Sequence, residues 1–102
     1  MTVWFVSRHP GAVEWARTQG ITVDHWISHL AVAEVASCDT VIGTLPVQLA
    51  AEVCAKGARY LNLSLDLPFE WRGRELSADE LRETKARLEE FVITKPKVSW
   101  RC

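Results

Sequence analysis

The chain alternates short apolar runs with longer amphipathic stretches, and this alternation predicts strands separated by helices. The clearest apolar runs cover residues 3–6, 39–45 and 59–65, while residues 21–27 alternate apolar and polar side chains less regularly. Short apolar runs are typical of buried strands in a parallel sheet, and the weaker alternation suits an edge strand. We therefore expect an α/β fold, a small Rossmann-like parallel sheet with helices on both faces.

Proline and glycine mark the ends of two predicted helices. One helix begins at about Pro10 and stops at Gly20, and the other begins at Pro46 and stops at Gly57. Proline is favoured in the first turn of a helix, and glycine is favoured at the residue just after its last turn. The positions of these residues therefore predict a helix in both segments. Between them, residues 31–37 are compatible with a short helix or with a turn.

A capping box predicts where the last helix begins. Ser77 and Glu80 have the spacing in which each side chain bonds the other residue's backbone N–H. From this point we expect one long helix whose apolar stripe contains Leu81, Leu88 and Phe91.

Composition and charge indicate an ordinary globular domain. We expect one domain over residues 1–94, followed by a basic tail over residues 95–102 that is mobile or docks through Trp100. The formal charge of −1 argues against a long nucleic acid or a membrane as partner, and no apolar run approaches the ~20 residues that span a bilayer. We expect a cytoplasmic protein whose affinity for phosphate groups is local.

Polar residues follow each predicted strand. They are the segment Ser7-Arg8-His9, the pair Ser28-His29, the loop Gly43-Thr44-Leu45-Pro46 and the segment Ser64-Leu65-Asp66. If the strands are parallel, these four clusters lie at one edge of the sheet, where α/β proteins bind their ligands. The sequence therefore predicts a ligand site at the carboxyl edge of the sheet.

The chemistry of these clusters suits a phosphate-bearing ligand. Arg8 can donate two parallel N–H groups to a phosphate, Ser7 and Thr44 can donate to its other oxygens, and His9 can donate, accept or transfer a proton. Gly43 would let a ligand approach the backbone, and the amides after Thr44 would point outward at the start of a helix. Ser64 and Asp66 at the end of the fourth strand, and Arg72 in the following loop, are further candidates for ligand contacts.

Structural roles compete with each of these assignments. An Arg-His pair after a strand is also a common solvated turn, and glycine followed by proline is also ordinary strand-to-helix loop chemistry. Asp66 would suit a ribose hydroxyl and a turn equally well. The loop that contains Arg72 and Arg74 could fold over a bound anion or remain a solvated charged loop.

The sequence offers little support for a metal or a nucleotide cofactor. Cys38, Cys54 and Cys102 are widely spaced and read as thiols, with Cys54 on the apolar side of a helix. Asp24, His25 and His29 do not converge on an extended segment, so surface histidines are expected there. Neither a G-x-G-x-x-G nor a Walker-type motif occurs, so we expect no metal and no cofactor.

Several segments together resemble the small CRISPR-associated Csx-sixteen family of type III systems over about residues 2–93. The resemblance is carried in order by Val3-Trp4-Phe5-Val6-Ser7-Arg8-His9-Pro10-Gly11-Ala12, by Val41-Ile42-Gly43-Thr44-Leu45-Pro46 with Leu49-Ala50-Ala51-Glu52-Val53, by Leu63-Ser64-Leu65-Asp66-Leu67-Pro68 and by Arg72-Gly73-Arg74-Glu75-Leu76.

The resemblance implies a CARF-like fold and a ring nuclease that opens cyclic tetra-adenylate, switching off the antiviral response. It implies metal-independent attack by a ribose 2′-hydroxyl on the adjacent phosphodiester, which yields linear di-adenylates with 2′,3′-cyclic phosphate ends. A homodimer would present the same edge twice to the cyclic ligand. Five tryptophans, more than a small core needs, also favour dimerisation.

In this hypothesis Arg8 clamps the scissile phosphate, Ser7 and Thr44 position it, and His9 assists proton transfer to the leaving oxygen. His9 could instead bind adenine or cap the turn. The main alternative is a protein that binds cyclic oligoadenylate without cleaving it, as a sponge or a sensor. A general RNA nuclease and a structural adaptor are weaker alternatives.

Overall fold

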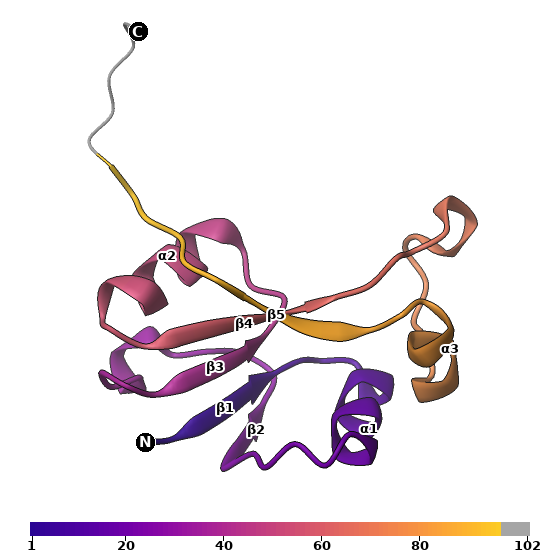
Figure 1. Ribbon diagram of the computed structural model, residues 1–102, viewed down its shortest axis with the longest axis horizontal. Helices are drawn as coiled ribbons and strands as arrows, with labels where there is room; N and C mark the ends of the chain where they lie inside the picture. Colours follow the sequence, from indigo (N-terminus) through magenta and orange to yellow (C-terminus); the bar gives the residue numbers. More distant parts are fainter. Residues whose placement is uncertain (97–102) are drawn as a thin grey trace, which may run out of the picture.

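The computed structural model describes residues 1–96 and contains a five-stranded sheet flanked by helices (Figure 1). The strand order is β2-β1-β3-β4-β5. The first four strands run parallel and β5 runs antiparallel to β4. The expected α/β fold is therefore confirmed, with an antiparallel edge strand that the pattern did not predict. The strands are β1 Val3–Val6, β2 His25–Ile27, β3 Thr40–Gly43, β4 Arg59–Ser64 and β5 Arg87–Phe91.

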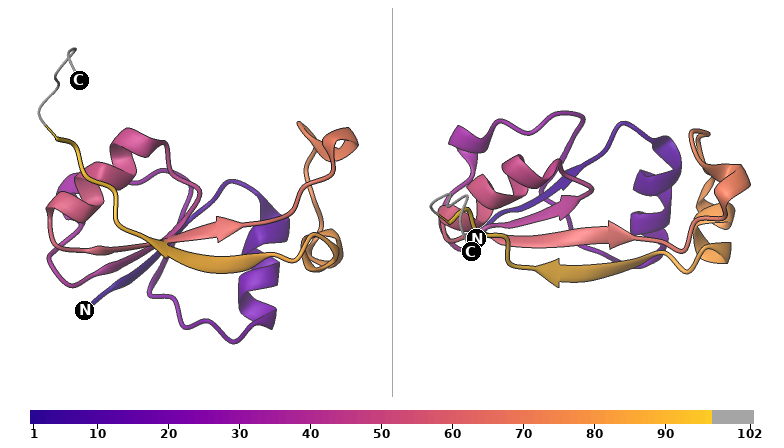
Figure 2. Two further views of the ribbon diagram at one scale, coloured as in Figure 1. Left: turned by 45° about the horizontal axis from the view of Figure 1, so that its top comes forward. Right: turned by 90° about the horizontal axis from the view of Figure 1, so that it is seen from above.

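Helices cover both faces of the sheet, as expected (Figure 2). The helices α1 and α3 pack on one face and α2 on the other, while the segment between β4 and α3 projects from the rest of the molecule (Figures 1 and 2). The helices are α1 Pro10–Thr18, α2 Val47–Ala55 and α3 Ala78–Glu83, with short 3-10 turns η1 Val32–Glu34 and η2 Phe69–Trp71.

The central strands are buried on both faces, which divides the interior into two cores. Phe5 and Ile42 pack with α1 and α3, whereas their neighbours Trp4 and Val41 pack with α2. Successive side chains of a strand point to opposite faces of the sheet, and here both faces are buried. The side chains that face either core must therefore be apolar, which explains the unbroken apolar runs in the sequence.

The same hydrogen-bonded motif ends all three α-helices. In α1, Gly20 N donates to Arg17 O at 3.1 Å and Ile21 N donates to Ala16 O at 3.3 Å. This paired arrangement is the Schellman motif, which needs a residue with positive φ just past the helix, and Gly20 has a φ of 71°. Gly57 plays the same part after α2.

The long last helix predicted from the capping box is wrong, although the capping box itself is present between Ser77 and Glu80. The helix α3 ends at Glu83 because Lys85 adopts a φ of 58° and completes a Schellman motif without a glycine. Leu88 and Phe91, expected on the helix, lie instead on β5.

The second strand is shorter than predicted and begins only at His25. Asp24 precedes it and ties the chain to β1, since its carboxylate accepts from Val3 N at 2.7 Å and its own N–H donates to Val3 O at 2.9 Å. Ile21 and Val23 reach the α1 core from the loop before the strand. The apolar residues of 21–24 therefore serve packing rather than sheet pairing.

Asp39 is a buried carboxylate that joins the beginning of β1 to the loop before β3. It accepts from Ala36 N at 2.9 Å, Thr2 N at 3.0 Å and Trp4 Nε1 at 3.2 Å. These hydrogen bonds favour the charged form of the carboxylate and hold the pKa of Asp39 below its usual value. The bond from Ala36 N has the largest effect.

Some predictions concern the end of the chain. Trp100, its proposed docking and the Cys102 thiol lie outside the described residues, as does the basic tail from residue 97 onward. The division into a domain of residues 1–94 and a tail stays a prediction. Within residues 1–96, no helix has the length and apolar character needed to cross a membrane.

Replacing Asp39 by asparagine tests this carboxylate. We expect Asp39→Asn to lower the thermal unfolding midpoint at pH 7 by several degrees, because an amide nitrogen cannot accept from these donors. Because the pKa is lowered, the stabilisation is complete above the unfolded-state pKa of about 3.9 and is lost as the pH falls through the folded-state pKa. The difference between wild type and variant, followed by circular dichroism, should therefore shrink below about pH 4. Asp79→Asn, at an exposed ion pair with Arg82, is the control and should change little.

Candidate functional site

The candidate site lies where the direction of the sheet's connections reverses. β1 and β3 are neighbours, but the chain leaves β1 into α1 on one face and leaves β3 into α2 on the other. Such a reversal opens a crevice at the carboxyl ends of the two strands, the usual ligand site of open α/β sheets. A pocket of about 540 Å³ lies at this point, and we call it the switch-point pocket.

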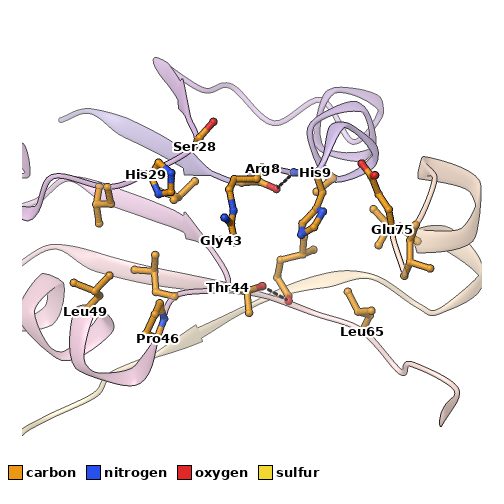
Figure 3. Close-up of a pocket in the computed structure, with 18 of the residues that line it drawn as sticks. Arg8, His9, Ser28, His29, Gly43, Thr44, Pro46, Leu49, Leu65 and Glu75 are labelled. Atoms are coloured by element: carbon orange, nitrogen blue, oxygen red, sulfur yellow. Dashed lines mark hydrogen bonds between the residues drawn. The ribbon is translucent and has the colours of Figure 1, made fainter. Parts of the chain in front are cut away.

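Seven of the predicted site residues line the switch-point pocket, and they come from two loops. Figure 3 labels Arg8, His9, Gly43, Thr44 and Pro46 among them. The two loops follow β1 and β3 and contribute the N-terminal ends of α1 and α2. The seven residues are Ser7, Arg8, His9, Gly43, Thr44, Leu45 and Pro46.

The turn after β1 holds Arg8 and His9 at the mouth of the pocket. Ser7 N donates to Ile27 O at 2.9 Å, which extends the pairing with β2 by one residue. The Ser7 hydroxyl accepts from His9 N at 3.1 Å, so it stabilises the turn. Arg8 and His9 are exposed, and Figure 3 shows both side chains over the pocket.

Gly43 is required at the floor of the pocket by a close backbone approach. Its φ is 156°, and a Cβ built there would lie 2.6 Å from the carbonyl oxygen of Val6. That distance is too short for any carbon side chain, so only glycine lets β3 pair with β1 up to its last residue.

A buried hydroxyl holds the loop after Gly43. Tyr60 OH accepts from Leu45 N at 3.0 Å and lies 2.5 Å from Asn62 Oδ1, to which it can donate. Burial raises the pKa of Tyr60 above its usual value, which keeps this donor protonated. The expected outward amide of Leu45 is therefore used inside the protein, while the Thr44 hydroxyl donates to Leu63 O at 3.3 Å.

Three predicted residues do not line the pocket. Leu63 and Leu65 line the pocket but Ser64 between them does not, because successive side chains of an extended chain point to opposite faces of the sheet. Ser64 Oγ accepts from Asn62 Nδ2 at 2.8 Å, and Asp66 pairs with Arg87 at 3.3 Å.

The third such residue is Arg72, whose guanidinium carbon lies 5.9 Å from the centre of the Phe69 ring. Ligand contacts by Ser64, Asp66 and Arg72 stay predictions.

Four further polar residues line the pocket. Ser28 and His29 line it from the end of β2, and Arg74 and Glu75 line it from the segment before α3. Ser28-His29 follows β2 in the same way that Ser7-Arg8-His9 follows β1. This position at the end of a strand is the feature of the sequence that indicates a place at the pocket. The sequence places Ser28-His29 at this edge of the sheet, but it gives no sign that His29 has a role beyond that of a surface histidine.

Apolar side chains form much of the pocket wall. Leu30, Leu45 and Leu49 come from the α2 side, whereas Leu63 and Leu76 come from the α1 and α3 side. A wall of leucines beside arginine, histidine and hydroxyl groups suits a ligand that has both anionic and flat apolar parts, such as a nucleotide.

Metal-binding clusters and disulfides give no further candidates within the described part of the chain. There, no group of three or more His, Cys, Asp or Glu side chains is placed to hold a metal ion. Cys38 and Cys54 are free thiols, as expected, and Cys54 packs against the α2 core.

The fold and the pocket define an α/β protein with a pocket of leucine and polar side chains at its topological switch point. Residues 4–94 match the family described as "Putative CRISPR-associated protein (Cas_VVA1548)", and the chain belongs to this family. No curated protein and no solved structure matches the chain. The CRISPR association expected from the sequence is thus confirmed at the level of the family.

Gly43→Ala tests the close approach at the pocket floor. We expect a loss of about 3 kcal/mol of folding free energy, because the new Cβ would force β3 away from the Val6 carbonyl. Gly20→Ala is the matched control, since Gly20 also has positive φ but no atom lies within 4 Å of its Cβ position. Gly20→Ala should lower the folding free energy only by the backbone strain of about 1 kcal/mol. Equal losses in urea unfolding would show that the approach to Val6 is unimportant.

Proposed function

We propose that this CRISPR-associated protein is a metal-independent ring nuclease of a type III system. It binds cyclic tetra-adenylate and cleaves it to linear di-adenylates with 2′,3′-cyclic phosphate ends, which removes the second messenger of the antiviral response. Two observations support the proposal. The chain belongs to a CRISPR-associated family, and its sequence resembles the Csx-sixteen family, for which the resemblance implies a CARF-like fold.

The observation that carries the proposal is the convergence of Arg8, His9 and Thr44 on one leucine-walled pocket at the switch point. Arg8 supplies a planar pair of donors for a phosphodiester, and the N-terminal ends of α1 and α2 add the favourable end of each helix dipole. The leucines supply apolar surface for adenine. A nucleotide with a backbone phosphate satisfies both requirements.

The reaction needs orientation and charge stabilisation from the protein. Arg8 clamps the scissile phosphate and offsets the charge that develops on its oxygens. Ser7 positions the phosphate, and Thr44 does so when its hydroxyl turns from Leu63 O to a phosphate oxygen. The 2′-hydroxyl oxygen attacks phosphorus in line, and the bond from phosphorus to the 5′-oxygen breaks. His9, at the start of α1, donates a proton to this leaving oxygen.

A homodimer completes the site in this proposal. A ring of four adenylates is larger than a pocket of about 540 Å³ holds, and the pocket is open toward solvent. Two copies related by a twofold axis would place two such pockets around one cyclic ligand, whose own symmetry matches that arrangement. The protein acts where the ligand is made, in the cytoplasm.

Incubation of the purified protein with cyclic tetra-adenylate in excess EDTA tests the function. We expect linear di-adenylates by chromatography and mass spectrometry. Arg8→Ala should weaken binding about 10- to 100-fold, because a charge-assisted hydrogen bond to phosphate contributes about 1.5–3 kcal/mol. Arg82→Ala removes an exposed arginine that pairs with Asp79 outside the pocket, and it should match the wild type.

Other outcomes would contradict the proposal in different ways. An intact ring recovered with the wild-type protein would indicate a sponge or a sensor. Cleavage that disappears in EDTA and extends to linear RNA would indicate a general nuclease. Absence of binding would remove cyclic tetra-adenylate as the ligand.

A further inference from the structure

Cleavage by a 2′-hydroxyl requires two proton transfers. The attacking hydroxyl loses a proton as its oxygen bonds to phosphorus, and the leaving 5′-oxygen gains one as its bond to phosphorus breaks. The proposed function assigns only the second transfer, to His9. The first transfer needs a group in the switch-point pocket that accepts a proton near neutral pH.

Few pocket residues can accept that proton. Besides His9, the ionisable side chains that line the pocket are Arg8, His29, Arg74 and Glu75. Arginine is always protonated in proteins and cannot act as a base. His29 and Glu75 are the remaining candidates.

The geometry of in-line attack distinguishes between them. The attacking and leaving oxygens lie on opposite sides of phosphorus, so the base and the acid must also lie on opposite sides of the phosphate. Figure 3 shows His29 and His9 on opposite sides of the Arg8 side chain, while Glu75 lies on the same side as His9. If Arg8 holds the phosphate, the residue that faces His9 across it is His29.

The strand order independently supports the placement of His29. β1 lies between β2 and β3 in the sheet, so the end of β1, which carries Arg8, lies between the end of β2 and the end of β3. His29 follows β2 and lines the pocket from that side, whereas His9 caps the start of α1. The strand order thus places His29 on the β2 side of Arg8, and Figure 3 shows His9 on the other side.

We propose that His29 is a second catalytic residue, the general base that pairs with His9 as general acid; this assignment rests on the proposed function. Neutral His29 takes the proton of the 2′-hydroxyl as the 2′-oxygen bonds to phosphorus. The bond from phosphorus to the 5′-oxygen breaks, and protonated His9 gives its proton to that oxygen. The products carry a 2′,3′-cyclic phosphate and a 5′-hydroxyl, and solvent exchange restores both imidazoles.

The charges around the two imidazoles are compatible with these roles. Arg8 comes from the turn after β1, and Arg74 and Glu75 come from the segment before α3, whereas α2 and the loop before it contribute only uncharged lining residues. Arg74 pairs with Glu80 and lies 4.4 Å from the centre of the Trp71 ring, so part of its charge is offset outside the pocket. Arg8 remains the central cation between the histidines.

Single-turnover cleavage of cyclic tetra-adenylate by His29→Gln and His9→Gln tests the assignment. Each variant should cleave about 100-fold or more slowly, with binding changed less than about threefold. The wild-type rate should rise and then fall with pH. His29→Gln should lose the rising limb, since the base must be neutral, and His9→Gln should lose the falling limb, since the acid must be protonated.

A sulfur-substituted ligand separates the two roles. In cyclic tetra-adenylate with sulfur at the bridging 5′ position, the leaving thiolate needs no proton. This ligand should restore fast cleavage to His9→Gln and should not restore it to His29→Gln. His25→Gln is the matched control, since His25 is an exposed histidine on β2 that stacks on Trp4 outside the pocket, and it should behave as the wild type.

The outcomes separate this assignment from the proposed function. A wild-type protein that leaves the ring intact overturns both. If the wild-type protein cleaves the ring and His29→Gln cleaves it at a rate within threefold of the wild type, the role of His29 is overturned. Rescue of His29→Gln by the sulfur-substituted ligand would overturn it as well. Neither result contradicts the proposed ring nuclease activity. Circular dichroism should give all three variants the wild-type unfolding midpoint.

Discussion

The contact between Gly43 and the carbonyl of Val6 is the constraint on which the site depends. A Cβ at Gly43 would lie 2.6 Å from the Val6 oxygen, so β1 and β3 pair to their last residues only because position 43 has no side chain. The two loops that leave these strands then diverge to opposite faces of the sheet. The crevice between them holds Arg8, His9 and Thr44 around one pocket.

Much of the fold follows from local patterns, and the exceptions have identifiable causes. The apolar runs identify β1, β3 and β4, and Gly20 and Gly57 identify where two helices end. The third helix ends at Glu83 because Lys85 takes the positive φ just past it, and lysine gives no stop signal, so the pattern predicts a continued helix where the structure has β5. Tertiary packing stabilises the positive φ there, since Ala86 packs in the α1 and α3 core.

The site was predictable where strands of similar length end together. Arg8, His9 and the loop of Gly43 and Thr44 meet because β1 and β3 both span four residues and are paired along their whole length. β4 has six residues and extends beyond them, and alternation along it turns Leu63 and Leu65 toward the pocket and Ser64 away from it. Strand length depends on pairing with β5, a partner that the sequence pattern did not reveal.

The walls of the switch-point pocket belong to two separate cores, one under α1 and α3 and one under α2. The sheet is the shared layer between these cores, and α1 and α2 lie on opposite sides of it (Figure 2). A ligand in the pocket touches both walls at once and therefore acts as a cross-link between the two layers. Its binding free energy opposes the opening of either layer, so occupancy protects the backbone amides of α1 and α2 from exchange together.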